Sequence, residues 1–285
     1  MLHPQQSPSR LLVLFLVWTL APFGHADERQ NPLPDLRIAT GTNGVLEAWF
    51  EDPTSRYAHF VLGGNYEPAT LAVRTERGVL RTTLSADSVF EDREPRLADL
   101  DGDGNDEVIV VRSYQRGGAA LAIYHVQNGQ LVRLTETPDM GHPYGWLNPA
   151  GIADFDGDGQ LEVLFVRKPH VMGRLEMWRL EQGAMVRVAT MTDTSNHVNG
   201  SPQIRLSTVA DFDGDGLPDL AIPDFDRRAI RFLRFTNGVK EFGRVKLPAP
   251  AVGDFTPQGN ASPSGRSIAI PLRNGDVVRI MPPTQ

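Results

Sequence analysis

Short apolar runs separated by turn-forming residues recur along most of the chain. EVIVVR (107–112), EVLFVR (162–167) and DLAIP (219–223) are nearly continuous in apolar residues, which is typical of strands that are buried on both faces. No convincing segment shows the periodicity of an amphipathic helix over three turns. The pattern therefore predicts an all-β fold.

Turn pairs that contain glycine lie between many of these runs and predict β-hairpins. Asparagine and glycine accept the positive φ that a two-residue hairpin turn requires. Three clear pairs recur at regular intervals, and weaker copies lie nearer the two ends. The clear pairs are Asn128-Gly129, Gln182-Gly183 and Asn237-Gly238, and the weaker ones are Asn43-Gly44, Arg77-Gly78 and Asn274-Gly275.

An acidic decapeptide occurs three times, as ADLDGDGNDE (98–107), ADFDGDGQLE (153–162) and ADFDGDGLPD (210–219). The copies start 55 and 57 residues apart, and a period of this length indicates a propeller, a solenoid or an array. An apolar run, a loop and a hairpin pair follow each copy, and a short stretch precedes it, which makes four strands. Four antiparallel strands repeated around a ring form a β-propeller.

We predict a single propeller domain over residues 27–285, with repeats that begin near residues 47, 97, 152, 209 and 252. This gives five blades, or six if the two end hairpins belong to different blades. Residues 48–60 and 252–270 are interpreted as degenerate copies that have lost most of the acidic string. The hairpin at 36–50 and the short last repeat are expected to share a blade, so that N- and C-terminal strands close the ring.

The acidic string has the side chains of a metal-binding loop. Counted from its first aspartate, carboxylates occupy positions 1, 3, 5 and 9, and glycine occupies position 6. Such closely spaced carboxylates repel one another unless a hard cation lies among them, and the glycine lets the carbonyl at position 7 turn toward the same ion. The predicted ligands are Asp99, Asp101, Asp103, Asn105 and Glu107; Asp154, Asp156, Asp158, Gln160 and Glu162; and Asp211, Asp213, Asp215, Leu217 and Asp219.

Calcium suits these loops better than magnesium, which demands stricter geometry, or zinc, which prefers histidine and cysteine. An EF-hand needs glutamate at position 12, where this chain has Val110, Phe165 and Ile222 inside apolar runs. We therefore expect about three calcium ions in loops of another type. Their expected role is structural, because an ion that binds only the folded state stabilises it.

The three strings resemble the calcium loops of FG-GAP repeats, the blade units of the integrin α-subunit propeller and of bacterial VCBS-repeat proteins. The resemblance is strongest over residues 95–225. It implies that each loop joins the first two strands of a blade, with calcium ligands at the positions given above. The integrin propeller has seven blades, more than the residues after Ala26 can supply at this period.

The N-terminal segment has the pattern of a secretory signal peptide. Arg10 precedes the apolar run LLVLFLVWTLAPF (11–23), and small residues precede a cleavage site after Ala26. The run is short for a membrane span, and no later stretch is apolar enough to form one. We therefore expect an exported protein of bacterial type, periplasmic or extracellular, with no membrane span after cleavage.

Charge and cysteine content narrow the classes of partner and of chemistry. Twenty-eight basic and 35 acidic residues give a net charge of −7, which argues against nucleic acid and anionic membranes as partners. The chain has no cysteine, so it has neither disulfides nor thiol chemistry. Calcium would offset part of the acidic charge.

Loops opposite the acidic strings are expected to form a ligand face. In an up-and-down blade, the second connection and the links between blades lie on the face opposite the first and third connections. Loops on a rigid scaffold often bind ligands. A protein- or glycan-binding scaffold is the favoured function; a glycan-active lyase or hydrolase is the alternative, should the histidines converge. The candidate residues are His142, Tyr144, Trp146, His170, His197, Asn199 and Arg205, and no catalytic residue is assigned.

Overall fold

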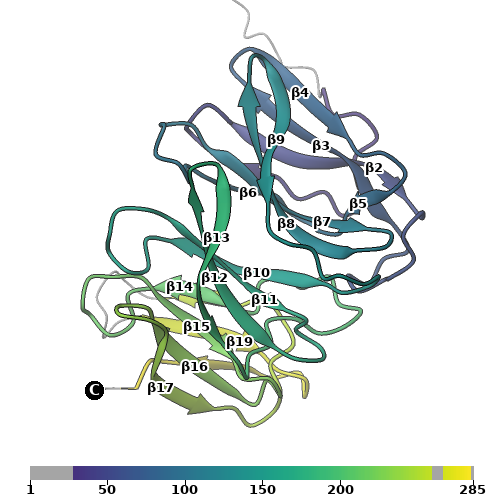
Figure 1. Ribbon diagram of the computed structural model, residues 1–285. Coiled ribbons are helices and arrows are strands. Elements are labelled where there is room, and N and C mark those ends of the chain that lie inside the picture. Colours follow the sequence, from purple (N-terminus) through teal and green to yellow (C-terminus); the bar gives the residue numbers. More distant parts are fainter. Residues whose placement is uncertain (1–27, 259–265, 284–285) are drawn as a thin grey trace, which may run out of the picture.

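The computed structural model describes residues 28–258 and 266–283, and this part of the chain contains strands and turns but no helix. Consistently, no helix there is long and apolar enough to cross a membrane. The strands form five antiparallel sheets that follow one another along a curved path (Figure 1). The all-β prediction is confirmed. The proposed signal segment lies outside the described residues.

Each sheet is a meander in which neighbouring strands are consecutive or nearly consecutive in sequence. The first sheet has the order β1-β2-β3-β4, and the second has the order β5-β7-β8-β9, with β6 also paired to β7. The bounds in these two sheets are β1 Ala39–Thr40, β2 Glu47–Thr54, β3 Glu67–Thr75, β4 Gly78–Thr83, β5 Ser88–Phe90, β6 Arg96–Ala98, β7 Glu107–Tyr114, β8 Gly118–Gln127 and β9 Gln130–Glu136.

The third and fourth sheets repeat this plan with four strands each, and the fifth has three described strands. The chain therefore builds the same unit repeatedly, as a propeller does. The bounds are β10 Leu147–Ala153, β11 Glu162–Arg167, β12 Arg174–Glu181, β13 Ala184–Met191, β14 Thr208–Ala210, β15 Asp219–Pro223, β16 Ala229–Arg234, β17 Lys240–Lys246, β18 Thr256–Gln258, β19 Ser267–Pro271 and β20 Val277–Ile280.

The apolar runs are continuous because the central strands are buried on both faces. In β7, Val108 and Val110 belong to a core shared with the first sheet, whereas Ile109 and Val111 belong to one shared with the third sheet. Successive side chains of a strand point to opposite faces, so both sets must be apolar. Neighbouring sheets thus hold each other together through a core at each interface.

Within residues 28–258 and 266–283, the N-terminal and C-terminal strands do not share a sheet, so the predicted closure by a joint terminal blade is wrong. β1 pairs with β2 in the first sheet, and β18–β20 form a sheet without an N-terminal strand among the described residues. The error came from Asn43-Gly44, which was interpreted as a turn outside the first unit. In the structure it joins the first strand to the second, so the first unit begins at β1 and not near residue 47. The blade number of a closed ring stays a prediction.

Asn274-Gly275 forms the predicted hairpin turn, but in the second connection of its sheet, between β19 and β20, whereas Asn128-Gly129 lies in a third connection. Gly44 and Gly275 have φ values of 75° and 90°. Any tight turn can require such a positive φ, so the dipeptide marks a turn without saying which connection it is.

Candidate metal loops and the opposite face

The three acidic strings form the connections from the first to the second strand of their sheets: β6 to β7, β10 to β11 and β14 to β15. This is the placement that the FG-GAP resemblance implied. The acid at position 9 is the first residue of the second strand in each case and is buried. The glycine at position 6 has φ between 87° and 93° in all three copies, at Gly104, Gly159 and Gly216, which explains the glycine there.

Backbone hydrogen bonds orient the first aspartate of each loop. Gly102 N and Gly104 N donate to Oδ1 and Oδ2 of Asp99 at 2.8 and 3.0 Å. In the second loop, the amides of Gly157 and Gly159 bind the two oxygens of Asp154 at the same distances. The repeated network shows that the sequence repeat is also a repeat of local geometry.

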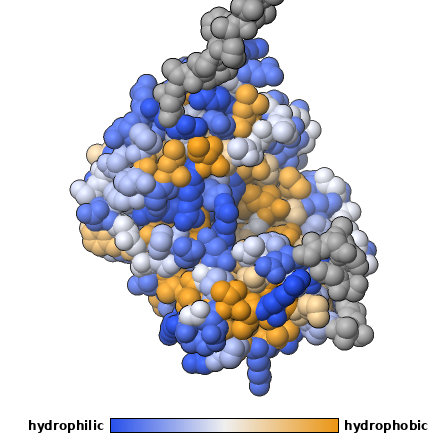
Figure 2. Space-filling model, turned by 180° about the vertical axis from the view of Figure 1, so that it is seen from behind, coloured by the Kyte–Doolittle hydropathy of each residue, from blue (hydrophilic) through white to orange (hydrophobic). Residues whose placement is uncertain are grey.

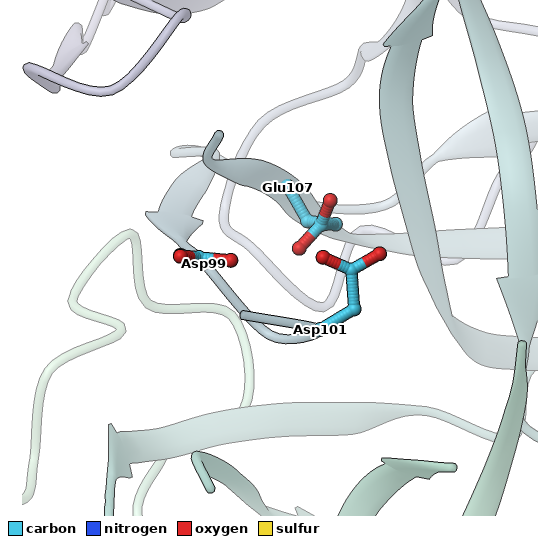
Figure 3. A group of neighbouring side chains, drawn as sticks. All are labelled: Asp99, Asp101 and Glu107. Atoms are coloured by element: carbon cyan, nitrogen blue, oxygen red, sulfur yellow. The ribbon is translucent and has the colours of Figure 1, made fainter. Parts of the chain in front are cut away.

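Carboxylates converge within each loop. Figure 3 shows Asp99, Asp101 and Glu107 facing a common space, and each offers an oxygen within 4.8 Å of the others. Asp154, Asp156 and Glu162 do the same in the second loop. In the third loop the converging set is Asp211, Asp213 and Asp215.

The third loop differs because its position 9 carries the shorter aspartate. One oxygen of Asp219, Oδ2, accepts from Phe212 N at 2.7 Å and Asp213 N at 3.2 Å. The other, Oδ1, is buried without a hydrogen-bond partner. A buried carboxylate oxygen without a partner is costly, and a bound cation would relieve that cost.

The other predicted ligands serve the loops through backbone contacts. The amides at position 7, of Asn105, Gln160 and Leu217, donate to Oδ1 of the position-5 aspartate at 2.8, 2.9 and 2.8 Å. Asp103 and Asp158 are not in the converging sets of their loops. Hence three of the five predicted ligand positions converge in each loop, and position 5 replaces position 9 in the third.

The loops concentrate negative charge in a partly desolvated place. Burial, and then the charges of Asp101, Asp103 and Asp99, raise the pKa of Glu107 to about 7. Burial also raises the pKa of Asp219 to about 7, with further contributions from Asp213 and Asp215. Calcium prefers negatively charged oxygen ligands, and its charge would offset the repulsion among these carboxylates. The residues present therefore fit that ion.

The loops differ in the basic residue that faces them from the third strand. The residue opposite the position-9 acid is His125 in the second sheet, Arg179 in the third and Arg234 in the fourth, by the strand register. Arg179 contacts Asp156 at 2.8 Å, Asp158 at 2.9 Å and the carboxylate of Glu162. Arg234 lies 3.6 Å from Asp213. Within the described residues no ion pair reaches the first loop.

Acidic loops and hairpin turns share one face, as expected from blade geometry. A groove of about 930 Å³ is lined by Asp99–Gly102, Gly159–Leu161 and the 182–184 turn. Thr42, Arg77, Asp103 and Gly129 line a second groove of about 580 Å³. The ligand candidates therefore lie on the loops of the other face.

Three of those candidates meet in a cluster in which Trp146 and His197 are buried and His170 is half-buried. Trp146 stacks on His170 with ring centroids 5.9 Å apart and meets His197 edge-on at 4.7 Å. His170 Nε2 lies 2.9 Å from His197 Nδ1, and His197 Nε2 lies 2.9 Å from the carbonyl of Ser201. Burial lowers the pKa of His170 to about 4 and that of His197 to about 3, so both are neutral near pH 7.

No hydrogen bond or ring contact among the described residues joins the remaining candidates to this cluster. His142 is exposed and its Nδ1 lies 2.9 Å from the Pro143 carbonyl. Tyr144 is 54% exposed and packs on Tyr57, with ring centroids 5.5 Å apart. Asn199 is exposed, and Arg205 forms an ion pair with Glu94. His142 therefore shares no hydrogen bond or ring contact with His170 or His197 in the part of the chain that the structure describes.

Sequence reasoning missed a neighbouring series of hydrogen-bonded polar side chains on this face. His59 Nδ1 lies 2.6 Å from Glu91 Oε1, and Ser113 Oγ donates to Glu91 Oε2 at 2.5 Å. The His59 ring is 5.4 Å from that of Tyr144. The stretch YAHF (57–60) lies between two apolar strands, as KPHVMG (168–173) does. This shared position in the repeat could have identified His59 as a candidate for the same face as His170.

Comparison with known proteins supports the repeat assignment. Residues 99–165 match a family model described as an FG-GAP-like repeat, which confirms the resemblance read from the acidic strings. No curated protein matches the chain.

Two solved structures align with this chain, each with 11% sequence identity. A chain in the crystal structure of BBS1N in complex with ARL6DN aligns with a TM-score of 0.47 over 87% of this chain and 64% of its own length. *Saccharomyces cerevisiae* Sqt1 aligns with a TM-score of 0.46 over 76% of this chain and 54% of its own length. The chain thus spans about half to two thirds of these structures.

Proposed function

We propose that this protein is an exported, calcium-binding β-propeller that acts as a binding or scaffold module for a protein or glycan. The observation that carries the calcium assignment is the convergence of three carboxylates in each of three sequence-related loops. The all-oxygen donor sets and the buried, unpartnered Asp219 Oδ1 support calcium over softer metals. The structural role expected of each ion is to stabilise the loop that connects the first strand of a sheet to the second.

The ligand surface is proposed on the loops opposite the calcium loops. These loops carry the exposed aromatic and apolar side chains Phe60, Tyr144, Val171 and Met172. The face in Figure 2 shows several apolar areas set among hydrophilic side chains. Among the described residues, no hydrogen bond or ring contact joins His142 to the neutral pair of half-buried His170 and buried His197, so this arrangement does not favour the enzymatic alternative.

Calcium binding is expected to weaken as the pH falls below about 7. In the calcium-free protein, Glu107 and Asp219 have pKa values of about 7 and hold protons that a bound cation must displace. Both carboxylates are ionised at pH 8, whereas both are mostly protonated at pH 6, so affinity should be higher at pH 8. Isothermal titration calorimetry in two buffers of different ionisation enthalpy measures this proton release. Equal affinity at both pH values, with no proton release, would contradict it.

Export is tested separately, by the intact mass of the secreted product. When the full chain is expressed in a bacterium, cleavage after Ala26 should yield a product that begins at Asp27. A mature chain that retains Met1 would refute the leader assignment and leave the calcium proposal untouched.

A further inference from the structure

Three arginines line one cavity on the proposed ligand face. The β15–β16 loop contributes Arg227 and Arg228, and the β19–β20 connection contributes Arg273. The cavity has a volume of about 470 Å³, and its walls include the apolar side chains Phe225 and Pro250. Such a basic site is unexpected in a chain with net charge −7.

Backbone hydrogen bonds fix the segments that bear these arginines. Ala251 N donates to the carbonyl of Arg227 at 2.8 Å, and Leu247 N donates to that of Arg228 at 2.8 Å. Arg273 N donates to the carbonyl of Pro250 at 2.9 Å. The link after β17 thus ties the two arginine-bearing loops together, so the fold itself places the three residues around one space.

The positive charge in the cavity is poorly compensated. No ion pair within the described ranges joins Arg227, Arg228 or Arg273 to an acid at 4 Å or less, although Asp226 lines the cavity and the charges of Asp226 and Asp224 act on Arg227 from farther away. The Arg227 guanidinium donates to Ser195 Oγ at 3.2 Å, while its Nε is buried without a partner. Burial, and then the charge of Arg273, lower the pKa of Arg227, and the smaller effects of Asp226 and Asp224 do not reverse the shift.

Arg227 also has a backbone conformation that a side-chain-bearing residue seldom adopts. Its φ is 59°, in the left-handed region. Residues held in that region cost free energy and cluster at ligand-binding sites. The three neighbouring arginines lack close acidic partners, and Arg227 has a strained backbone. Both features indicate that the cavity binds a negatively charged group from another molecule.

We propose that this cavity binds an oxyanion, a carboxylate, phosphate or sulfate group carried by the ligand of this face. Planar guanidinium groups bind such anions through paired hydrogen bonds, and the negative charge of the anion would offset part of the positive charge of the three arginines. Phe225 and Pro250 would contact the apolar part of the same ligand. The inference rests on the proposed binding role of this face, but it does not depend on calcium binding.

Titration of the calcium-loaded full chain with phosphate, sulfate and acetate tests the cavity. Calorimetry should detect binding that weakens with added sodium chloride, since screening opposes it. Preference for phosphate or sulfate indicates a tetrahedral group, and preference for acetate indicates a carboxylate; either result supports the site. Binding of none of the three anions by the wild-type chain would overturn it.

Two variants locate the binding. Arg273→Gln and Arg227→Gln should each weaken it about tenfold or more, the loss of one charge-assisted pair. Arg116→Gln is the matched control, because Arg116 is exposed on a second connection of another sheet and does not line the cavity. Arg273 is exposed, so its variant is expected to fold even if Arg227→Gln does not. Unchanged affinity in Arg273→Gln would overturn the proposal, whereas loss of calcium binding would bear only on the proposed function.

Discussion

Removal of calcium with EGTA is expected to lower the melting temperature by about 10 °C or more. An ion present at a hundred times its dissociation constant stabilises the folded state by about 2.7 kcal/mol per site, and a protein of this size loses about 2–4 °C per kcal/mol. The three proposed calcium loops would contribute one such site each. Without calcium, the buried acids Glu107 and Asp219 also lie among like charges.

Thermal unfolding followed by circular dichroism measures this effect. Added calcium should restore the melting temperature, and magnesium at the same concentration should restore it less, because magnesium requires stricter geometry and holds its water. Identical melting curves with EGTA and with calcium would show that the loops are stable acidic turns that need no ion.

Arg179→Gln is expected to raise the calcium affinity of the second loop by about tenfold or more, because removing a competing charge-assisted contact is worth at least about 1.5 kcal/mol. The guanidinium already binds carboxylates of Asp156, Asp158 and Glu162, so calcium must displace it or share those oxygens. In the absence of calcium the same substitution should lower stability, since it leaves the buried Glu162 uncompensated.

The first sheet provides an internal precedent for an arginine in this role. Its β1–β2 connection has no aspartate, yet it keeps Gly44 with φ 75° and Glu47 at the start of β2. Arg74, opposite Glu47 in the register, donates to that carboxylate at 3.1 Å. An arginine on the third strand therefore binds the acid that begins the second strand, in a sheet whose first connection lacks the aspartates.

Calcium titrations of wild type, Arg179→Gln and the control Arg187→Gln separate these contributions. Arg187 lies on β13 and is 3.7 Å from Glu176, outside the loop. The control should titrate as the wild type does. If Arg179→Gln bound calcium no more tightly than the wild type, Arg179 would not compete with the ion.

The acidic loops could be predicted from sequence because their geometry is local. Asp99 is oriented by amides within five residues of it, and Gly104 supplies the turn. Nothing distant in sequence is needed for the carboxylates to converge. The two-sided burial of β7 could likewise be predicted, since an apolar run without alternation has no solvent-facing side.

The features that sequence reasoning missed depend on contacts between distant segments. His59 binds Glu91, and Arg227 meets Arg273, across loops that only the folded sheets bring together. Arg179 was overlooked because its position opposite Glu162 is set by strand register, which depends on tertiary packing. The turn pairs Asn43-Gly44 and Asn274-Gly275 show the same limit, because the dipeptide alone does not tell which connection of a sheet it forms.

The calcium content of the dialysed protein tests the central claim most directly. After equilibration with saturating calcium, elemental analysis should find close to three ions per chain, one for each converging carboxylate set. Asp99→Asn, Asp154→Asn and Asp211→Asn should each remove about one ion and leave the others bound, because the loops lie on separate sheets. A wild-type chain with no more calcium than the buffer blank, or three variants with unchanged calcium content, would contradict the account.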